Sequence, residues 1–347
     1  MLKAFKNRQL IIVPLEGLTE RYSVMMNSVL KPCADIWVYP DSFPEEGQIT
    51  NGEFLDISRT IEFKTLQLNM IARMFSNNII RDGDVFFFSD IFFPGLESVR
   101  YMAELAGIKI FVFAINYAGR SDPSDFVRKL NHWSDYSEKA WHEACDEVFV
   151  GSVWHEKKIL EHFHIDNLFV TGLVYDPQWI KNICSIGLGK NDYVIWPHRP
   201  CLEKGLSELI KYAQITDRQI IMTSCGNRKL QLPAGKNLPS NVAVVYGLSK
   251  YEYYVLMAGA RYYLSTAYQE TFGYTLQEAI LYSCIVAVPD RVCYPEFVKR
   301  ESLYTDLHEI DRIFDNGILN KPVDYHNWQQ MINRMTFIIE KGSKCIA

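Results

Sequence analysis

The chain has 347 residues, of which 48% are hydrophobic, 22% are charged and 14% are aromatic. This composition excludes a disordered chain, and the length suits two domains better than one. The formal net charge of -5 argues against a protein that binds nucleic acid through its overall charge, although a local basic surface is compatible with it.

Short, nearly continuous apolar segments recur along the chain and alternate with longer amphipathic segments. In chain order, the apolar segments are 10–14, 85–90, 109–116, 147–152, 168–172, 193–198, 219–224, 242–247, 261–267 and 284–290. The amphipathic segments include 95–107, 134–145, 154–164, 204–215, 249–259 and 274–283. Apolar strands of this kind are typical of parallel sheets buried on both faces. The alternation predicts an α/β chain with doubly wound sheets.

A stretch that contains Gly and Pro, at about 172–192, is the expected seam between two domains. We expect a Rossmann-like domain over 1–175, a second one over 190–325, and a cleft between them. The segment 326–347 is expected to carry a helix, over 326–341, that packs back across the seam.

Cysteine spacing and the chain start bear on the cellular compartment. The eight cysteines form no CxxC pair, which argues against zinc ribbons and thioredoxin-like proteins and fits a reducing compartment. No apolar run is long enough to span a bilayer, and the charged start MLKAFKNRQ does not resemble a signal peptide. We therefore expect a soluble, cytoplasmic protein.

The stretch WPHRPCLEKGLSELI (196–210) follows a predicted strand and opens a helix. It places His198, Arg199 and Lys204 at the carboxyl edge of the sheet, where ligands of such folds bind. A guanidinium and an ammonium beside a helix start suit a diphosphate. A solvated charged loop is the alternative interpretation.

The stretch STAYQETFGYTLQEAI (265–280) also joins a predicted strand to a helix. Glu270 lies in the loop and Glu278 in the helix, and carboxylates suit the paired hydroxyls of sugars. The turn between them consists of Thr271, Phe272 and Gly273. Its backbone N–H groups are expected to be free to bind an anion, and Gly273 allows close approach of a ligand. The alternative is an ordinary helix with two acidic residues, but both stretches together predict a nucleotide-sugar site.

These residues carry a resemblance to a known family. Glu270 and Glu278 with the intervening Thr-Phe-Gly resemble the donor-site motif of retaining GT-B glycosyltransferases, particularly the GT4-type group. Arg199 and Lys204 resemble that group's Arg and Lys pair, and the segment 244–267 is similar to the group's approach to the motif. WPHR and the residues around the glutamates are also similar to tRNA-queuosine mannosyltransferases and to glycosyltransferases of phages that modify their DNA. The resemblance covers about 170–300.

The resemblance implies a role for each donor-site residue. Glu278 would hold the nucleotide ribose, and Glu270 with the amides of 271–273 would contact the donor sugar and phosphate. Arg199 and Lys204 would stabilise the leaving diphosphate, which requires no metal and no cofactor. The co-substrate would be a UDP-sugar or GDP-sugar, and the sugar would be transferred with retention. Further donor contacts are expected from His198, Gly247 and Leu248.

By the same resemblance, the N-terminal half supplies the acceptor side. Gly17 follows the first strand and is a candidate for a loop over the donor phosphates. Ser89 and Asp90 end a strand, and Asp90 would orient or deprotonate an acceptor hydroxyl, with a turn or N-cap as the alternative. Asn116 and Arg120 lie at the next strand end, where ordinary loop residues are the alternative.

The implied acceptor is a hydroxyl on a modified nucleobase, either 5-hydroxymethylpyrimidine in phage DNA or a base in tRNA. A phage-encoded enzyme would work in the host cytoplasm. The basic and aromatic stretches 128–133 and 154–158 are candidates for contacts with a phosphate backbone. A glycan or lipid acceptor, a non-catalytic GT-B-like binding protein, and an epimerase or phosphorylase of the same fold remain alternatives.

Overall fold

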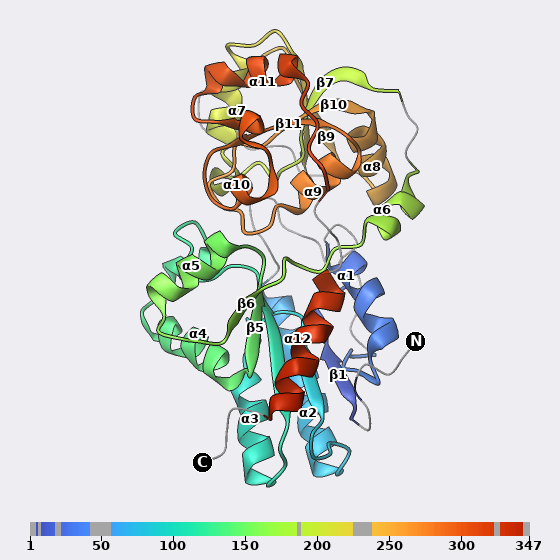
Figure 1. Ribbon diagram of the computed structural model, residues 1–347, viewed down its shortest axis with the longest axis vertical. Coiled ribbons are helices and arrows are strands. Elements are labelled where there is room, and N and C mark those ends of the chain that lie inside the picture. Colours follow the sequence, from blue (N-terminus) through green and yellow to red (C-terminus); the bar gives the residue numbers. More distant parts are fainter. Residues whose placement is uncertain are drawn as a thin grey trace. The chain divides into compact units, whose positions relative to one another are not determined.

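The computed structural model describes residues 5, 8–17, 22–41, 57–185, 189–224, 238–322 and 327–342. They belong to two compact units. Unit 1 contains the described residues up to 41, residues 57–175 and residues 327–342, whereas unit 2 contains the described residues from 176 to 322. Each unit has a six-stranded parallel sheet flanked by helices (Figure 1). The predicted α/β fold with two Rossmann-like sheets is confirmed.

The sheet of unit 1 has the strand order β2-β1-β3-β4-β5-β6. Its strands are β1 (Leu10–Val13), β2 (Ile36–Trp37), β3 (Val85–Phe88), β4 (Phe111–Asn116), β5 (Glu147–Val150) and β6 (Leu168–Val170). Every residue of β1, β3, β4 and β5 is buried, which explains why these strands are apolar apart from Asn116 at the end of β4 and Glu147 at the start of β5. The helices of this unit are α1 (Ser23–Leu30), α2 (Ile57–Ser76), α3 (Leu96–Leu105), α4 (Trp133–Ala144), α5 (Val153–His162) and α12 (Asn327–Lys341).

Helix α12 packs on the sheet of unit 1, although it follows unit 2 in the chain (Figure 1). Arg334 donates two hydrogen bonds of 2.5 Å to the buried carboxylate of Glu147 on β5. The ring of Trp328 meets the ring of Phe87 on β3 edge-on, with 5.0 Å between the centroids. The helix therefore completes unit 1 with both an ion pair and an aromatic contact.

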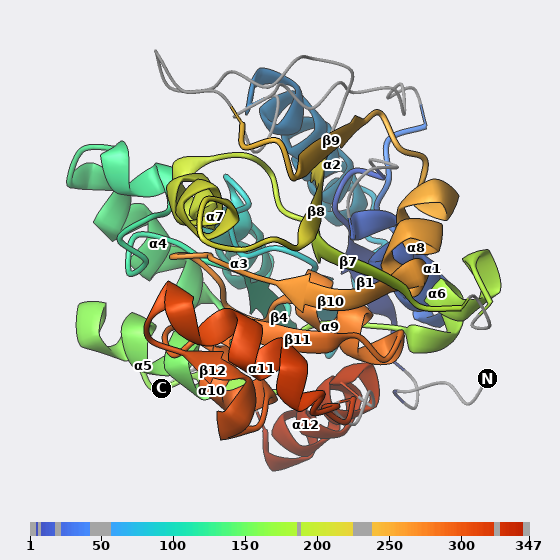
Figure 2. The same ribbon diagram turned by 90° about the horizontal axis from the view of Figure 1, so that it is seen from above.

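The sheet of unit 2 has the strand order β12-β11-β10-β7-β8-β9 (Figure 2). Its strands are β7 (Asn191–Trp196), β8 (Gln219–Ser224), β9 (Val242–Tyr246), β10 (Ala260–Leu264), β11 (Ile285–Pro289) and β12 (Leu303–Tyr304). Its helices are α6 (Pro177–Ile183), α7 (Leu206–Ala213), α8 (Lys250–Gly259), α9 (Tyr274–Leu281), α10 (Tyr294–Phe297) and α11 (Ile310–Asn316). Trp196, Leu209 and Tyr262 contribute to its apolar core.

The predicted elements agree with the structure except for two very short strands and the start of one helix. Every predicted apolar segment contains a strand, but β2 and β12 were not predicted because each has only two residues. The helix predicted over 204–215 begins only at Leu206, because Gly205 adopts a φ of 73° after a 3-10 turn at Leu202–Lys204. None of the described helices combines the length and the apolar character needed to cross a membrane.

Candidate functional site

Strand order in unit 2 brings the two predicted site loops together. Strand β10 pairs in parallel with β7, so the loops that follow both strands lie at the same edge of the sheet. The carbonyl of Glu203 accepts hydrogen bonds from the backbone N–H groups of Tyr268, at 2.8 Å, and Gln269, at 3.1 Å. Thr266 Oγ1 accepts a hydrogen bond from the indole of Trp196 at 3.0 Å. The loops at about 198–205 and 266–273 are therefore one connected structure, which we call the paired loops.

Close approach of the paired loops requires glycine at position 205. A Cβ atom built on Gly205 would lie 2.1 Å from the carbonyl oxygen of Thr266. The positive φ of 73° is a further reason for glycine. Gly205 was not predicted as a site residue, although a glycine directly before a helix is a signal for a tight turn.

The two predicted phosphate-binding cations lie in this site and contact carboxylates. Lys204 Nζ donates to the carbonyl of Gln269 at 2.7 Å and lies 3.2 Å from Glu270 Oε2. Arg199 Nη2 lies 3.2 Å from Glu203 Oε1. The side chains of Arg199 and Lys204 are 19% and 16% exposed, so both are partly accessible at the carboxyl edge of the sheet.

Glu270 makes a contact that differs from the expectation for the turn. Its Oε1 accepts a hydrogen bond of 3.1 Å from the N–H of Gly273, which the sequence analysis expected to be free. Gly273 has a φ of 74° and directly precedes α9. In this structure the Glu270 carboxylate therefore occupies the hydrogen-bonding position that was assigned to an anionic ligand.

Glu278 is held on α9 by two tyrosines of α8. Tyr253 donates to Glu278 Oε2 at 2.6 Å, and Tyr254 donates to Oε1 at 3.0 Å. Burial raises the pKa of Glu278, and Lys250 and the two hydroxyls partly offset that rise. The sequence analysis predicted Glu278 but not the tyrosines, which come from a different helix.

Two further residues that were predicted to contact the donor lie in this part of unit 2. Gly247, with a φ of 63°, and Leu248 follow β9 and precede the N-cap of α8 at Ser249. They therefore lie at the start of the helix whose tyrosines hold Glu278.

His198, predicted to contact the donor, is a buried residue beside the paired loops. Only 5% of it is exposed, and its ring contacts the rings of Trp196 and Tyr263 edge-on. Burial, Lys204 and Arg199 hold its pKa well below the usual value, so the imidazole is neutral. The ring therefore belongs to the buried packing beside β7 and β10.

In unit 1, Asp90 lies directly after β3 and has two hydrogen-bond donors. Lys64 of α2 donates to Asp90 Oδ2 at 2.8 Å, and the N–H of Phe92 donates to Oδ1 at 3.1 Å. Ser89 is fully buried, and its hydroxyl has no hydrogen-bond partner among the residues that the structure describes. Lys64 was not predicted, because it precedes Asp90 by 26 residues.

Asn116 and Gly17 also lie at the carboxyl ends of strands in unit 1. Asn116 is fully buried, with Nδ2 3.1 Å from His142 Nε2. The N–H of Gly17 donates to the hydroxyl of Tyr39 at 3.3 Å. Both residues therefore make contacts within unit 1.

Arg120 organises the loop after β4. Its guanidinium pairs with Asp135 and donates to the carbonyl of Leu130 at 2.6 Å. With only 8% of the residue exposed, these contacts indicate a structural role for Arg120 within unit 1.

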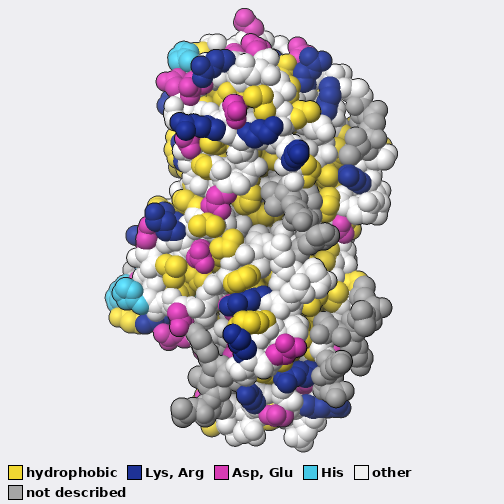
Figure 3. Space-filling view, in the orientation of Figure 1, with side chains coloured by type: hydrophobic (Ala, Val, Ile, Leu, Met, Phe, Trp, Pro, Cys, Tyr) yellow, Lys and Arg dark blue, Asp and Glu magenta, His cyan; other side chains and the backbone are white. Residues whose placement is uncertain are grey.

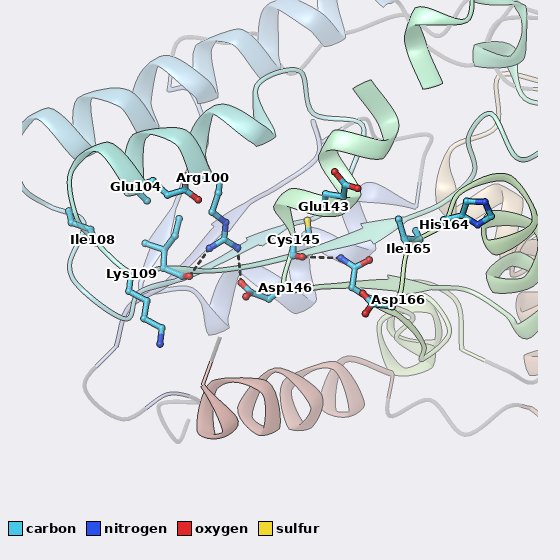
Figure 4. A pocket seen from close by; sticks show the side chains of 13 residues that line it. Arg100, Glu104, Ile108, Lys109, Glu143, Cys145, Asp146, His164, Ile165 and Asp166 are labelled. Carbon is cyan, nitrogen blue, oxygen red and sulfur yellow. Dashed lines mark hydrogen bonds and ion pairs between the residues drawn. The ribbon is translucent and has the colours of Figure 1, made fainter. Parts of the chain in front are cut away.

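A pocket of about 260 Å³ lies at the opposite edge of the unit 1 sheet (Figure 4). It is lined by residues just before the strands, including Ile110 before β4, Asp146 before β5 and Asn167 before β6. Arg100 points to Asp146 there and forms an ion pair of 2.8 Å. Because it lies at the amino ends of the strands, this pocket is separate from the predicted site residues of unit 1.

Comparison with solved structures identifies the fold as that of GT-B glycosyltransferases. The structure matches a sucrose-phosphate synthase from Thermosynechococcus elongatus with a TM-score of 0.65 and 11% identity, over 96% of this chain and 97% of the other. It matches a trehalose-6-phosphate synthase, studied for glycosyl transfer with retention, with a TM-score of 0.60 and 9% identity, over 96% and 95%. An E. coli trehalose-6-phosphate structure bound with UDP-2-fluoro glucose gives a TM-score of 0.60 and 9% identity, over 96% of each chain. The resemblance noted from the sequence is confirmed at the level of the fold.

A sequence comparison adds one relative. The chain is 29% identical over 120 residues to the tRNA-queuosine alpha-mannosyltransferase of Drosophila melanogaster. The match covers 32% of this chain and 32% of the fly protein. No family model matches the chain.

Proposed function

We propose that the protein is a glycosyltransferase that moves a hexosyl or pentosyl group from a nucleotide sugar to an acceptor hydroxyl. The observation that carries the proposal is the set of side chains at the carboxyl edge of the unit 2 sheet. Two cations, Arg199 and Lys204, and two carboxylates, Glu270 and Glu278, extend from elements joined by the paired loops. This chemistry suits a ligand with both phosphates and hydroxyls, and the fold is one that such enzymes use.

The proposed reaction breaks the bond between the anomeric carbon of the sugar and the diphosphate oxygen. The bonding electrons leave with the diphosphate, whose growing negative charge Arg199 and Lys204 would stabilise. The acceptor oxygen forms the new bond to the anomeric carbon and loses its proton, with Asp90 as the proposed base. We propose retention of configuration, in line with the trehalose-6-phosphate synthase of the same fold that was studied for transfer with retention.

Rearrangement of Glu270 is part of the proposal. The N–H of Gly273 donates to the carboxylate of Glu270, so a donor phosphate would have to displace that carboxylate to reach the amide. Lys204, which already contacts Glu270, would then be shared between the carboxylate and the phosphate. We therefore propose that donor binding moves the Glu270 side chain toward the sugar.

The proposed acceptor is a hydroxyl on a modified nucleobase, in tRNA or in phage DNA. It is supported by the name of the fly relative and by the exposed surface at the start of α4. Arg128 and Lys129 are exposed there, next to Trp133, which is 55% exposed, and Tyr136, which is 73% exposed. Exposed rings beside cations suit unpaired bases and phosphates. On the face drawn in Figure 3, lysine and arginine are interspersed with acidic residues, so nucleic-acid binding would depend on such a local surface.

The decisive experiment measures donor binding first and transfer second. A thermal-shift screen with UDP-, GDP-, ADP- and TDP-sugars is expected to show a rise in melting temperature with at least one of them. The donor so identified, radiolabelled in its sugar, is then tested for transfer to tRNA that contains queuosine. Binding without transfer to any nucleic acid, glycan or lipid acceptor would favour a non-catalytic binding protein.

A further inference from the structure

Helix α2 buries a row of polar side chains on a face where an amphipathic helix usually buries apolar ones. Thr60, Lys64 and Gln67 follow one another at spacings of four and three residues, so they lie on one face of the helix. They are 8%, 5% and 0% exposed. Farther along the same face, Ile71 and Met74 are apolar and belong to the core of unit 1. We call Thr60, Lys64 and Gln67 the polar stripe.

Two members of the polar stripe hold the chain that follows β1 and β2. Gln67 Nε2 donates to the carbonyls of Pro14, after β1, and Val38, after β2, each at 2.9 Å. Thr60 Oγ1 donates to Glu16 Oε1, also after β1, at 2.8 Å. The stripe therefore lies against the carboxyl ends of these strands, which is the edge where sheets of this type bind ligands.

The third member, Lys64, holds the chain that follows β3. Its ammonium donates to Asp90 Oδ2 at 2.8 Å and also to the carbonyl of Phe92. The N–H of Phe92 donates to the other oxygen of Asp90, Oδ1, at 3.1 Å. The carboxylate thus has one donor on each oxygen, and it cannot rotate without breaking a hydrogen bond.

Asp90 is the accessible end of this buried network. The side chain of Asp90 is 16% exposed, whereas that of Lys64 is 7% exposed. Glu16, the carboxylate that Thr60 contacts, is only 4% exposed. Lys64 therefore connects the interior of unit 1 to a carboxylate that a molecule outside the unit can reach.

Stability alone does not explain a lysine at position 64. Replacing a buried ion pair by apolar residues of similar size is often neutral or stabilising. Ile71 and Met74 show that the same face of α2 packs well with apolar side chains. An apolar residue at position 64 would satisfy the packing, so the ammonium is better explained by what it does to Asp90.

We propose that Lys64 is a positioning residue that fixes the Asp90 carboxylate in the orientation needed to take the proton of the acceptor hydroxyl. The inference rests on the proposed function, in which Asp90 is the base, and it extends that function to a residue of α2. The proton passes from the acceptor oxygen to an oxygen of Asp90 as the new bond to the anomeric carbon forms. Lys64 only donates hydrogen bonds and does not touch the acceptor.

The test compares two members of the polar stripe. Lys64→Met keeps an apolar chain and removes the ammonium, and Lys64→Gln is a second variant that retains a hydrogen-bond donor without the charge. Gln67→Met is the matched control, because Gln67 lies on the same buried stripe, donates two hydrogen bonds and does not bond to Asp90. Urea denaturation measures the stability of all three variants.

Turnover is measured with the radiolabelled nucleotide sugar that the thermal-shift screen selects. The acceptor is whichever of queuosine-containing tRNA, hydroxymethylated-pyrimidine DNA and the panel of lipids and oligosaccharides takes the label from the wild type. Lys64→Met and Lys64→Gln are expected to lower kcat by about tenfold or more and to leave the donor KM within about twofold, because a misplaced base affects the chemical step alone.

Gln67→Met is expected to keep kcat within about threefold of the wild type while losing at least as much stability as Lys64→Met, because it leaves two buried carbonyls without this donor. A merely structural role for Lys64 would instead lower kcat alike in the Lys64 and Gln67 variants. The comparison thus separates the positioning of Asp90 from the stability of the loops.

Four results would overturn the inference. Near-normal kcat in both Lys64 variants, or an equal loss in Gln67→Met, would reject the role of Lys64 and leave the proposed function standing. Full turnover in Asp90→Asn would reject the inference together with the assignment of the base, but not the transfer reaction. If the wild type transfers the label to none of the acceptors, the proposed function fails and the inference fails with it.

Discussion

At Lys204, one ammonium group contacts both a loop carbonyl and a carboxylate of the paired loops. This arrangement orders the side chain, so little side-chain freedom would remain to be lost if the proposed donor binds. The contact with Glu270 reduces the local positive charge. That charge would become available to a diphosphate if the carboxylate moves as proposed.

Lys204→Ala and Arg199→Ala are expected to lower turnover by about 100-fold or more, because each removes a cation that is proposed to stabilise the leaving diphosphate. Rates are measured with saturating donor, and urea denaturation checks that the fold is retained. Lys211→Ala and Arg312→Ala are the controls, since these side chains are 62% and 71% exposed on the same unit. Near-normal rates in both site variants, or a strict requirement for a metal that EDTA removes, would contradict the proposed role.

Gly205→Ala is expected to lower the free energy of unfolding by about 3 kcal/mol, because the new Cβ would meet the Thr266 carbonyl and the φ is positive. Gly107→Ala is a matched control, because Gly107 has a φ of 65° and a Cβ there would meet no described atom within 4 Å. There we expect a loss of about 1 kcal/mol from the backbone alone. Equal losses in urea denaturation would show that the close approach of the paired loops is unimportant.

The sequence points to candidate site residues but not to the side chains that contact them. Glu270, Glu278, Arg199 and Lys204 were predicted from their charge, their place after strands and the resemblance of their spacing to a family motif, and they stay predictions. Tyr253 and Tyr254 could not be found in this way, because their contact with Glu278 depends on how α8 packs beside α9. The contact of Lys64 with Asp90 likewise joins α2 to the end of β3.

At the scale of elements, α4 and α5 carry three buried titratable side chains. Burial raises the pKa of Glu138 on α4 to about 8. Burial also lowers the pKa of His142 on α4 and of His155 on α5 to about 3. All three groups are therefore neutral in the folded protein near pH 7, and each costs stability where the unfolded chain would be charged.

The free energy of unfolding depends on pH in opposite directions for Glu138 and for the two histidines. From pH 4.5 to about 8, folded Glu138 keeps a proton that the unfolded chain has lost, so the free energy of unfolding falls as pH rises. From pH 6.5 down to about 3, the unfolded histidines gain protons that the folded ones do not. The free energy of unfolding therefore falls as pH decreases. Glu138→Gln should flatten the alkaline decline and His155→Leu the acidic one, each by about 1 kcal/mol per pH unit.

Urea denaturation between pH 4 and pH 9 measures both slopes. His164→Leu is the control for the histidine variant, because His164 is exposed and lies two residues after the end of α5. Unchanged slopes in Glu138→Gln and His155→Leu would show that these groups titrate alike in the folded and unfolded chains.

Secondary structure was more predictable than the pairing of the strands. Continuous apolar runs identify the buried strands of both units, because their burial on two faces removes any alternation. The sheet order of unit 2 places β10 beside β7, whereas β8 and β9 lie between them in the chain. That crossover brings Lys204 to Glu270, and no local pattern in the sequence specifies it.

At the scale of the whole molecule, the proposed acceptor predicts a dependence on salt. If the acceptor is nucleic acid, binding should weaken steeply with salt as counterions are released from the phosphates. Fluorescence anisotropy with a labelled tRNA anticodon stem-loop measures this, and Trp133→Ala is expected to weaken binding by about tenfold. Tyr101→Ala, at a 63% exposed aromatic residue on α3, is the matched control.

Transfer assays with three acceptor sets complete this test. The acceptors are hydroxymethylated-pyrimidine DNA, tRNA that contains queuosine, and a panel of lipids and oligosaccharides. Asp90→Asn is expected to abolish transfer to nucleic acid while leaving donor binding intact, because the proposed base is lost. Transfer confined to the lipids and oligosaccharides would reject the nucleic-acid acceptor.

The position of α12 has a consequence for how the protein forms during translation. Glu147 is 3% exposed and receives its guanidinium partner from Arg334, so this carboxylate of unit 1 lacks that counter-charge until the helix leaves the ribosome. All the described residues of unit 2 are synthesised before α12. We therefore expect nascent chains that stop before residue 327 to hold a protease-resistant unit 2 beside a protease-sensitive unit 1. Unit 2 would thus fold before unit 1, which is the reverse of the usual order of folding from the N-terminus.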